Sequence, residues 1–216
     1  MRAGAAAGIA GPAAFTAAWI AGSLRQSGHP AAEIQISGLA AHDARDPWIM
    51  IAGFLVLGGC SVAFGAALPE ALGGRARAGA APGLIQGAGL ATIAAGLLRR
   101  DHMLLTSGSV SWHNHAHDVI SVAIYADLVA AQLLLAARFG RDPGSQGDSG
   151  QAGGLDWRPW RGWLLASAGV TAAVLVAFAA DTSAADAGIL QRVGVTIPLA
   201  VIAAIAARLV RTPASG

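Results

Sequence analysis

The sequence is poor in charge, has a single cysteine and contains no lysine. Charged residues make up 12% of its 216 residues, half of the roughly 25% that is usual for a soluble domain. With 55% hydrophobic residues and a mean hydropathy of +0.56, the chain needs lipid as its solvent. The lone Cys60 excludes a disulfide framework or a cysteine-based zinc site within one chain. The net charge of +2 is carried by scattered arginines, so a nucleic-acid partner is not expected.

Apolar segments long enough to cross about 30 Å of hydrocarbon recur along the chain. They predict an all-α integral membrane bundle of six transmembrane helices, forming a single domain over residues 1–216. The first segment is interpreted as a span and not a secretion signal, because it is long and no clean cleavage site follows it. Residues 140–155, rich in Gly, Ser and Asp, are predicted to be a flexible cytoplasmic linker. The predicted spans are residues 4–24, 48–68, 82–98, 119–137, 163–180 and 193–209.

The arginines indicate how the chain lies in the membrane. Six spans place nine arginines on the side of both termini and five on the other side. Because cytoplasmic loops carry an excess of basic residues, both termini are predicted to be cytoplasmic, in the cytoplasmic (inner) membrane. The five arginines on the extracytoplasmic side are Arg25, Arg45, Arg99, Arg100 and Arg192.

All the histidines fall in the connections that face the extracytoplasmic side in this arrangement. Most of the acidic residues lie there too, and this asymmetry is the main indication of function in the sequence. The alternative is that polar residues simply collect in short loops. The histidines are His29, His42, His102, His113, His115 and His117.

The densest group is His113-Asn-His-Ala-His117-Asp118, which runs into the fourth predicted span. If the helix already includes His113, then His113 and His117 stand on one face, one turn apart. Two such imidazoles could share a metal ion, with oxygen ligands from Asp118, Asp43 or Asp101. A histidine beside an aspartate could instead form an acid–base pair, in which the carboxylate orients the ring. A histidine-rich helix start could also serve only to cap the helix and to present polar groups to water at an interface.

Two further features could complete a site. Asp127 lies near the middle of the fourth predicted span, where a carboxyl group is costly, so it is predicted either to line the floor of a pocket or to make an interhelical hydrogen bond. The first long connection, residues 25–47, mixes charged and apolar residues. It is predicted to fold over the bundle as a lid, although a solvated loop fits nearly as well. Within it, Arg45 could pair with Asp43, Asp46 or an anionic ligand.

Several segments resemble a known family, the bacterial and archaeal membrane proteins grouped as domain of unknown function 998. The resemblance is best from Gly11 to Phe139. The segments that resemble its first helix, first loop and second helix are Gly11-Pro12 with Trp19, Ile36-Ser37-Gly-Leu39, and Trp48-Ile-Met50 with Gly53-Phe54 and Gly58. The segments that resemble the family's Asp after the third helix and its paired His before the fourth are Leu97–His102 and His113-x-x-x-His117-Asp118.

The family has no settled activity, so the resemblance supports the topology and a choice of site residues. Two features depart from the family pattern, the basic turn at Arg99-Arg100 and the additional His115. The site residues that the resemblance implies are Ser37, Asp101, His113, His117 and Asp118.

The leading hypothesis is a multi-pass membrane enzyme acting on a lipophilic substrate, such as an isoprenoid, acyl or polyketide-like molecule. His/Asp acid–base chemistry in a pocket near the extracytoplasmic face would support cyclisation, isomerisation or hydrolysis without a required cofactor. The candidate catalytic residues are His113, His117, Asp118, Asp101, Asp43 and Asp127. The candidate substrate-binding residues are Ser37, His42, Arg45, His102 and Tyr125.

Two alternatives remain open at this point. One is a zinc-dependent membrane lipid hydrolase with His113 and His117 as ligands; it has a looser likeness to seven-span hydrolases that hold zinc with Ser, Asp and HxxxH, but the chain is one span short. The other is a non-enzymatic lipid-binding, transport or assembly protein. In each case the expected partner is a membrane lipid or a lipophilic small molecule, and a homo-oligomer is compatible with the small-residue spacings.

Overall fold

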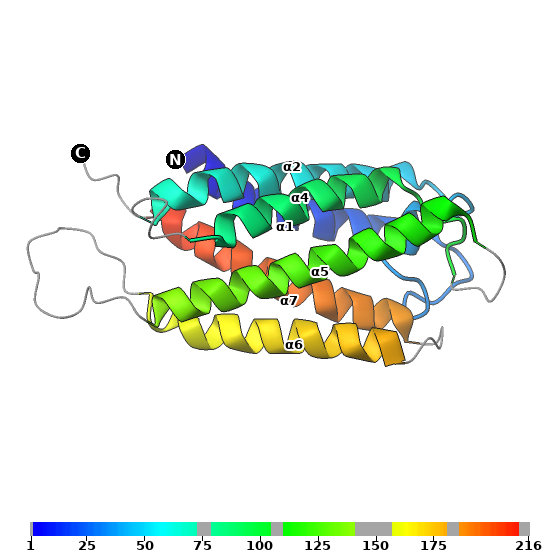
Figure 1. The fold of residues 1–216 in the computed structure, drawn as a ribbon. Helices are drawn as coiled ribbons and strands as arrows, with labels where there is room; N and C mark the ends of the chain where they lie inside the picture. The colour runs from blue at the N-terminus through cyan, green and yellow to red at the C-terminus, as the bar shows by residue number, and fades with distance from the viewer. Residues whose placement is uncertain (1, 73–78, 105–109, 141–156, 181–185, 212–216) are drawn as a thin grey trace, which may run out of the picture.

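The computed structural model describes residues 2–72, 79–104, 110–140, 157–180 and 186–211. In these residues the chain forms six α-helices and one 3₁₀ helix, without a β-strand. The α-helices run side by side along one bundle axis (Figure 1). In chain order the elements are α1 (Arg2–Arg25), η1 (Ser37–Ala40, the 3₁₀ helix), α2 (Trp48–Ala71), α4 (Ala81–Leu97), α5 (Trp112–Phe139), α6 (Trp160–Ala180) and α7 (Ala187–Arg211).

The helices form a closed ring. Each packs against its neighbours in chain order, and α7 packs against both α6 and α1. The close approach of α2 to α4 depends on two glycines that face each other. A Cβ atom on Gly58 would lie 2.5 Å from the Gly89 carbonyl oxygen, and a Cβ atom on Gly89 would lie 2.7 Å from the Gly58 oxygen. Small residues at such contacts allow helix backbones to approach closely in lipid.

The outer surface of the ring is apolar. Large side chains such as Leu90, Val119 and Val176 point outward and are exposed. In the described residues five helices are long and apolar enough to cross a membrane, and α4 is shorter with 17 residues. Helices satisfy their own backbone hydrogen bonds and therefore tolerate lipid around them. The chain is a multi-pass α-helical membrane protein, as its composition predicted.

The predicted spans correspond to the six helices, but the start of one differs in a way that matters for the site. Helix α5 begins at Trp112, not at residue 119, because Ser111 adopts an extended conformation and its hydroxyl accepts a hydrogen bond from the Asn114 amide at 3.4 Å. Such an N-cap allows a polar first turn to be helical. The predicted linker at 140–155 lies outside the described residues from residue 141 onward.

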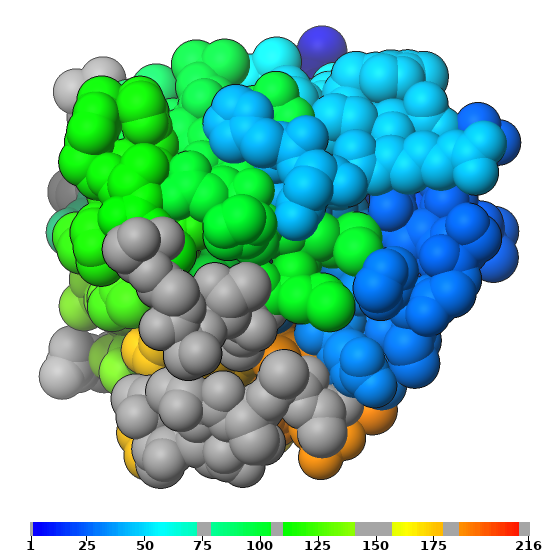
Figure 2. All heavy atoms as spheres, turned by 90° about the vertical axis from the view of Figure 1, so that its right-hand side faces the viewer, coloured from blue at the N-terminus to red at the C-terminus, as the bar shows by residue number. Residues whose placement is uncertain are grey.

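The α1–α2 connection, residues 26–47, covers one end of the ring and is called the lid. Its residues Ile34, Ile36 and Leu39 are at most 2% exposed and pack against Phe15 and Phe54 of the bundle. The prediction that this connection folds over the bundle is confirmed. Figure 2 shows this end, with the lid in blue beside the green α4–α5 connection.

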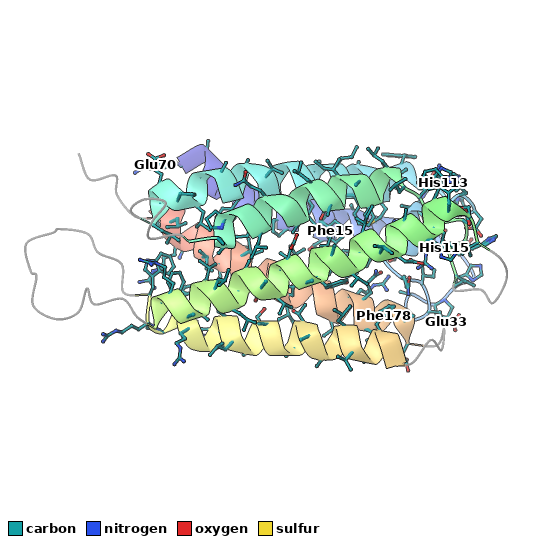
Figure 3. The ribbon with its side chains drawn as sticks, in the orientation of Figure 1. Phe15, Glu33, Glu70, His113, His115 and Phe178 are labelled. Carbon is teal, nitrogen blue, oxygen red and sulfur yellow. The ribbon has the colours of Figure 1, made fainter. Side chains whose placement is uncertain are left out.

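The histidines share this end of the bundle. His113 and His115 lie there, with Glu33 of the lid, whereas Glu70 lies at the opposite end (Figure 3). The lid also carries His29 and His42, the α4–α5 connection carries His102, and the second turn of α5 carries His117. We call it the histidine end.

Candidate functional site

His117 is the most deeply buried titratable side chain at the histidine end, with 1% of its surface exposed. Its Nδ1 atom lies 2.9 Å from the Ala95 carbonyl oxygen and 2.8 Å from the Leu98 carbonyl oxygen, at the C-terminal end of α4. These carbonyls accept hydrogen bonds, so Nδ1 carries the proton in the neutral ring. His117 thereby satisfies carbonyl groups that the end of a helix leaves without partners.

The other nitrogen of this ring has a different environment. The Nε2 atom of His117 is buried and has no hydrogen-bond partner among the described residues. In the tautomer fixed by the carbonyls, Nε2 is an unprotonated acceptor, which is the form of a general base. The Phe54 ring packs edge-on against the imidazole, with the ring centroids 6.4 Å apart.

The other two histidines of α5 lie outside this pocket. His113 is exposed and stacks on Trp112, with centroids 3.8 Å apart, and His115 is exposed as well. His113 and His117 are indeed one turn apart on a helix that includes both. However, only the His117 ring contacts the end of α4, and the structure does not bring the two rings into one buried site.

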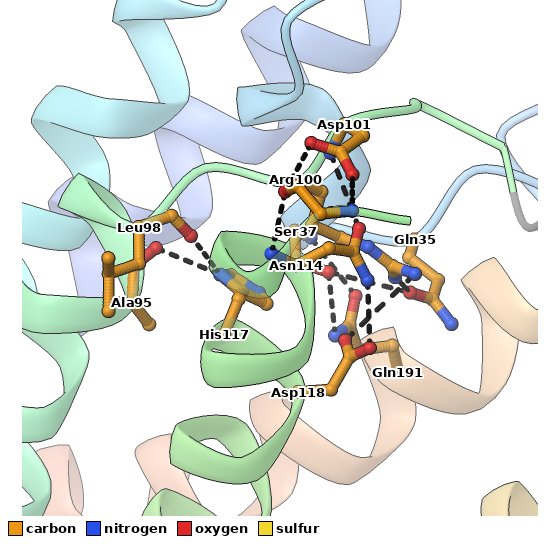
Figure 4. A network of polar contacts seen from close by, with 11 residues as sticks. Gln35, Ser37, Ala95, Leu98, Arg100, Asp101, Asn114, His117, Asp118 and Gln191 are labelled. Carbon is orange, nitrogen blue, oxygen red and sulfur yellow. Dashed lines mark hydrogen bonds and ion pairs between the residues drawn. The ribbon is translucent and has the colours of Figure 1, made fainter. Parts of the chain in front are cut away.

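A separate polar network lies beside His117 (Figure 4). Buried Arg100 donates a hydrogen bond to Gln35 of the lid and lies 3.9 Å from an Asp118 carboxylate oxygen. The Asn114 side chain donates to Asp118 at 2.9 Å and accepts from the Asp101 amide at 3.3 Å. Burial lowers the pKa of Arg100, and the nearby carboxylates of Asp118 and Asp101 oppose that shift.

Asp101 links the start of the α4–α5 connection to Ser111, the residue directly before α5. Its carboxylate accepts hydrogen bonds from the Ser111 amide at 2.5 Å and from the Ser111 hydroxyl at 2.8 Å. These two bonds hold the pKa of Asp101 below its usual range. The ionised carboxylate thus stabilises the turn, and it does not contact the His117 ring.

Asp43 joins the lid to the α4–α5 connection. Its carboxylate accepts from the Met103 amide at 2.7 Å and lies 3.4 Å from Nδ1 of His102. Both side chains of this His–Asp pair are about half exposed. The His42 amide donates to the Arg100 carbonyl oxygen at 3.1 Å, and the His42 side chain is exposed.

Arg45 does not make the predicted carboxylate pair. Asp46 instead pairs with Arg25 at 2.7 Å. The Arg45 backbone exchanges two hydrogen bonds with the Gln26 side chain, at 2.8 Å and 3.0 Å, and the Arg45 side chain is exposed. The reason is the turn before α2, which brings Asp46 back to the end of α1.

A mostly apolar cavity lies between the helices below the lid. This first cavity is lined by residues of α1, α2, α4, α5, α7 and the lid. Of the predicted substrate-binding residues, Ser37 and Tyr125 line it. Phe54 also lines it, so the ring that packs on His117 forms part of the cavity wall.

Asp127 is not among the residues that line the first cavity. It faces α4, where its carboxylate oxygen lies 3.1 Å from the position that a Cβ atom on Gly87 would occupy. The structure therefore places this half-buried acid at the α4–α5 contact and not on the floor of the first cavity.

The sequence matches the family described as "Protein of unknown function (DUF998)" over residues 9–208. The chain belongs to this family. No curated protein and no solved structure matches it. The DUF998 assignment agrees with the resemblance in the sequence and extends it over both later helices, α6 and α7.

The described residues of this DUF998 chain do not fit a zinc site. Among them, no three His, Cys, Asp or Glu side chains come together in a group that could hold a metal ion. His113 points outward, and the Nδ1 atom of His117 is engaged by carbonyl oxygens. A zinc site takes three or four protein ligands with free donor atoms. The donor set thus gives no support to the zinc hydrolase alternative.

Three polar residues of the network were not singled out from the sequence. Gln35 and Gln191 belong to no motif in the sequence. Asn114 could have been found, since it precedes Asp118 by four residues and such spacings place side chains in contact on a helix. Arg100 was considered for orientation and as part of a basic turn that departs from the family pattern, but nothing in the sequence shows that it is 8% exposed.

Proposed function

We propose that the chain crosses the cytoplasmic membrane six times with both termini in the cytoplasm. The first turn of α1 and the last turn of α7 lie at the same end of the bundle, which supports an even number of spans (Figure 1). Helix α4 lies between two longer helices, α2 and α5, and extends alongside them. Its 17 residues correspond to about 26 Å of helix, close to the hydrocarbon thickness.

The topology can be tested with single cysteines introduced into a Cys60→Ala background. His115→Cys at the histidine end is expected to react with a membrane-impermeant maleimide in intact cells. Glu70→Cys at the opposite end is expected to react only after permeabilisation. Reaction of both before permeabilisation, or the reverse pattern, would contradict the proposed orientation.

We further propose that this DUF998 protein is a membrane enzyme that holds a lipophilic substrate in the first cavity and moves a proton with His117. The observation that supports this function is the buried Nε2 atom without a described partner, on a ring that packs against Phe54 of the cavity wall. Small-molecule sites are typically lined by apolar side chains with a few polar groups, and the first cavity has this kind of lining. The Ala95 and Leu98 carbonyls orient the ring and fix its tautomer, which prepares Nε2 to accept a proton.

The remaining candidate residues have supporting roles in this proposal. Phe54 lies between the imidazole and the cavity, so a change in its rotamer brings the substrate and Nε2 together. Ser37 and Tyr125 contact the substrate as lining residues. The Asp118, Asn114 and Arg100 network positions the start of α5, and with it His117. The reaction class is proton transfer within an isomerisation, cyclisation or hydrolysis.

His117→Asn separates the two functions of the ring. An asparagine amide can still donate toward the α4 carbonyls, but it has no basic nitrogen. Detergent-purified wild type and variant are compared by mass spectrometry of the lipophilic molecules that they retain. We expect His117→Asn to retain a precursor that differs in structure from the molecule in the wild type. His115→Asn, exposed on the same helix, is the control and is expected to match the wild type.

The possible outcomes distinguish the hypotheses. The same molecule in wild type and His117→Asn, in equal amounts, would exclude catalysis by His117 and favour a lipid-binding protein. An absence of any bound lipophilic molecule in both would exclude the binding function as well.

A further inference from the structure

The two ends of the bundle differ strongly in charge. The end opposite the histidine end, which we call the arginine end, has nine arginines and four acidic residues in the sequence. The histidine end has five arginines and seven acidic residues, and the remaining acid, Asp127, lies between the ends. The arginine end thus carries an excess of five positive charges, whereas the histidine end carries an excess of two negative charges.

The described part of the arginine end has the same excess of charge. It contains six arginines and a single acidic residue, Glu70 of α2. Outside the described ranges this end adds three arginines and three aspartates in the sequence, so the excess does not change. An excess of this kind attracts the anionic head groups of a membrane. The six described arginines are Arg2, Arg138, Arg158, Arg161, Arg208 and Arg211.

Aromatic rings lie among these arginines. The end of α5, the start of α6 and the end of α7 are all at the arginine end (Figure 1). The Trp157 ring stacks on Phe139 with centroids 4.9 Å apart and contacts Trp160 edge-on at 6.0 Å. The Arg208 guanidinium lies over both indole rings, 4.9 Å and 5.7 Å from their centroids. Tryptophan is enriched at the head-group level of a bilayer, so these rings indicate the depth at which phosphates lie.

The start of α6 concentrates positive charge at this level. Arg161 lies in its first turn and packs against the end of α5, with its Cδ and Nε atoms 3.0 Å from the position of a Cβ atom on Gly140. The Arg161 side chain is exposed, and none of the ion pairs among the described residues includes it. The first turn of α6 contains no acidic residue, although a helix N-terminus favours negative charge. Arg161 therefore adds to the positive charge of the helix start, and this arrangement favours an anion from outside the chain.

The outer surface of α6 continues from this charge into lipid. Leu165 follows Arg161 by one turn on the same face of the helix and is 41% exposed. Trp163, also near the start of α6, is 69% exposed. A ligand here meets positive charge at one end and an apolar surface along its length. A phospholipid uses both features, whereas free phosphate would use only the charge.

We propose that the arginine end binds an anionic phospholipid at the start of α6, with its phosphate at Arg161 and its acyl chains along the outer face of α6. The other arginines of this end strengthen the attraction through their charge. This site lies at the opposite end of the bundle from His117. The inference is therefore independent of the proposed proton transfer and of the orientation in the membrane.

Native mass spectrometry of the detergent-purified full chain tests this inference. Phosphatidylglycerol is the anionic probe, and phosphatidylcholine with the same acyl chains is the probe without net charge. The wild type is expected to bind phosphatidylglycerol more tightly. Arg161→Gln should weaken phosphatidylglycerol binding about fivefold, which corresponds to about 1 kcal/mol per arginine near an anionic surface, and leave phosphatidylcholine binding unchanged. Arg161→Lys keeps the charge and should stay close to the wild type.

Two control variants separate a local site from a general attraction. Arg45→Gln removes an exposed arginine at the histidine end, and Arg2→Gln removes one at the arginine end on α1, which is not a neighbour of α6 in the ring. Both are expected to bind phosphatidylglycerol within about twofold of the wild type, a shift that corresponds to about 0.4 kcal/mol. Equal weakening by Arg2→Gln and Arg161→Gln would overturn the local site.

Three other results would also contradict the inference. A wild type that binds the two lipids equally would exclude recognition of the negative charge. An Arg161→Gln variant that matches the wild type would exclude Arg161 as the contact. Equal loss in Arg161→Gln and Arg161→Lys would assign the effect to packing against the end of α5. None of these results would affect the proposed role of His117.

Discussion

Replacing Gly58 with alanine is predicted to push apart the two helices that form one wall of the first cavity. A Cβ atom at this position would lie 2.5 Å from the Gly89 carbonyl oxygen, whereas ordinary contacts begin at 3.4 Å. The shortfall is 0.9 Å, and it falls on backbone that cannot rotate away. Overpacking of this kind costs about 1–3 kcal/mol. We therefore expect the free energy of unfolding to fall by that amount.

Gly59→Ala is a matched control at the next position. No atom of another element lies within 4 Å of the Cβ position on Gly59, which is exposed. Alanine there should be neutral or stabilise the helix by up to about 1 kcal/mol, because it loses less backbone entropy than glycine. Helical content is followed by circular dichroism as a denaturing detergent replaces a mild one. Equal stability of Gly58→Ala and Gly59→Ala would refute the close approach of α2 and α4.

Further predictions concern the histidine end. Ser111→Ala removes a hydrogen bond to Asp101, whose folded-state pKa lies below its usual range. The ionised Asp101 carboxylate therefore contributes its full stability above the ordinary pKa of about 3.9. This contribution is lost as the pH falls through the lower pKa of the folded state. The stability deficit of Ser111→Ala, measured by thermal unfolding, should therefore be largest near neutral pH and narrow below about pH 4. Arg192→Met removes hydrogen bonds to lid carbonyls and should make the lid more susceptible to proteolysis. The control is Arg25→Met, which breaks an exposed ion pair with Asp46 that is worth about 0–1 kcal/mol. Equal proteolysis of Arg192→Met and Arg25→Met would contradict the role of Arg192 in holding the lid.

The helices were largely predictable because a lipid environment strongly restricts the composition and the secondary structure of a segment. A segment surrounded by hydrocarbon must be apolar on nearly every face and helical throughout, so hydropathy alone locates it. The main error was the start of α5, where the polar turn after Trp112 has no hydropathy signal. Ser111 was the available indication, since serine at an N-cap permits such a turn. The lid was predictable for the same reason as the helices, since Ile34, Ile36 and Leu39 cannot remain in water.

The site was less predictable because burial at a helix end depends on neighbouring elements. His113 and His117 have nearly the same direction on the helix, yet only His117 reaches the last carbonyls of α4. The first cavity depends on how closely the helices approach, and in a chain so rich in Ala and Gly the sequence does not show that Gly58 and Gly89 face each other. Asp127 illustrates the same limit, since its depth could be inferred but the helix that it faces could not.

The structure also shows that several of the arginines counted for membrane orientation bind other parts of the fold. Four of the five on the histidine end bind the lid: Arg99 donates to the Ala40 and Ala41 carbonyls, Arg100 to Gln35, Arg192 to the Ala31 and Ile34 carbonyls, and Arg25 to the Asp46 carboxylate. At the other end Arg208 lies over the rings of Trp157 and Trp160. Residues that the fold requires carry little information on orientation. Without these five, the count of nine against five becomes eight against one, so the proposal of cytoplasmic termini does not depend on the arginines that bind the lid.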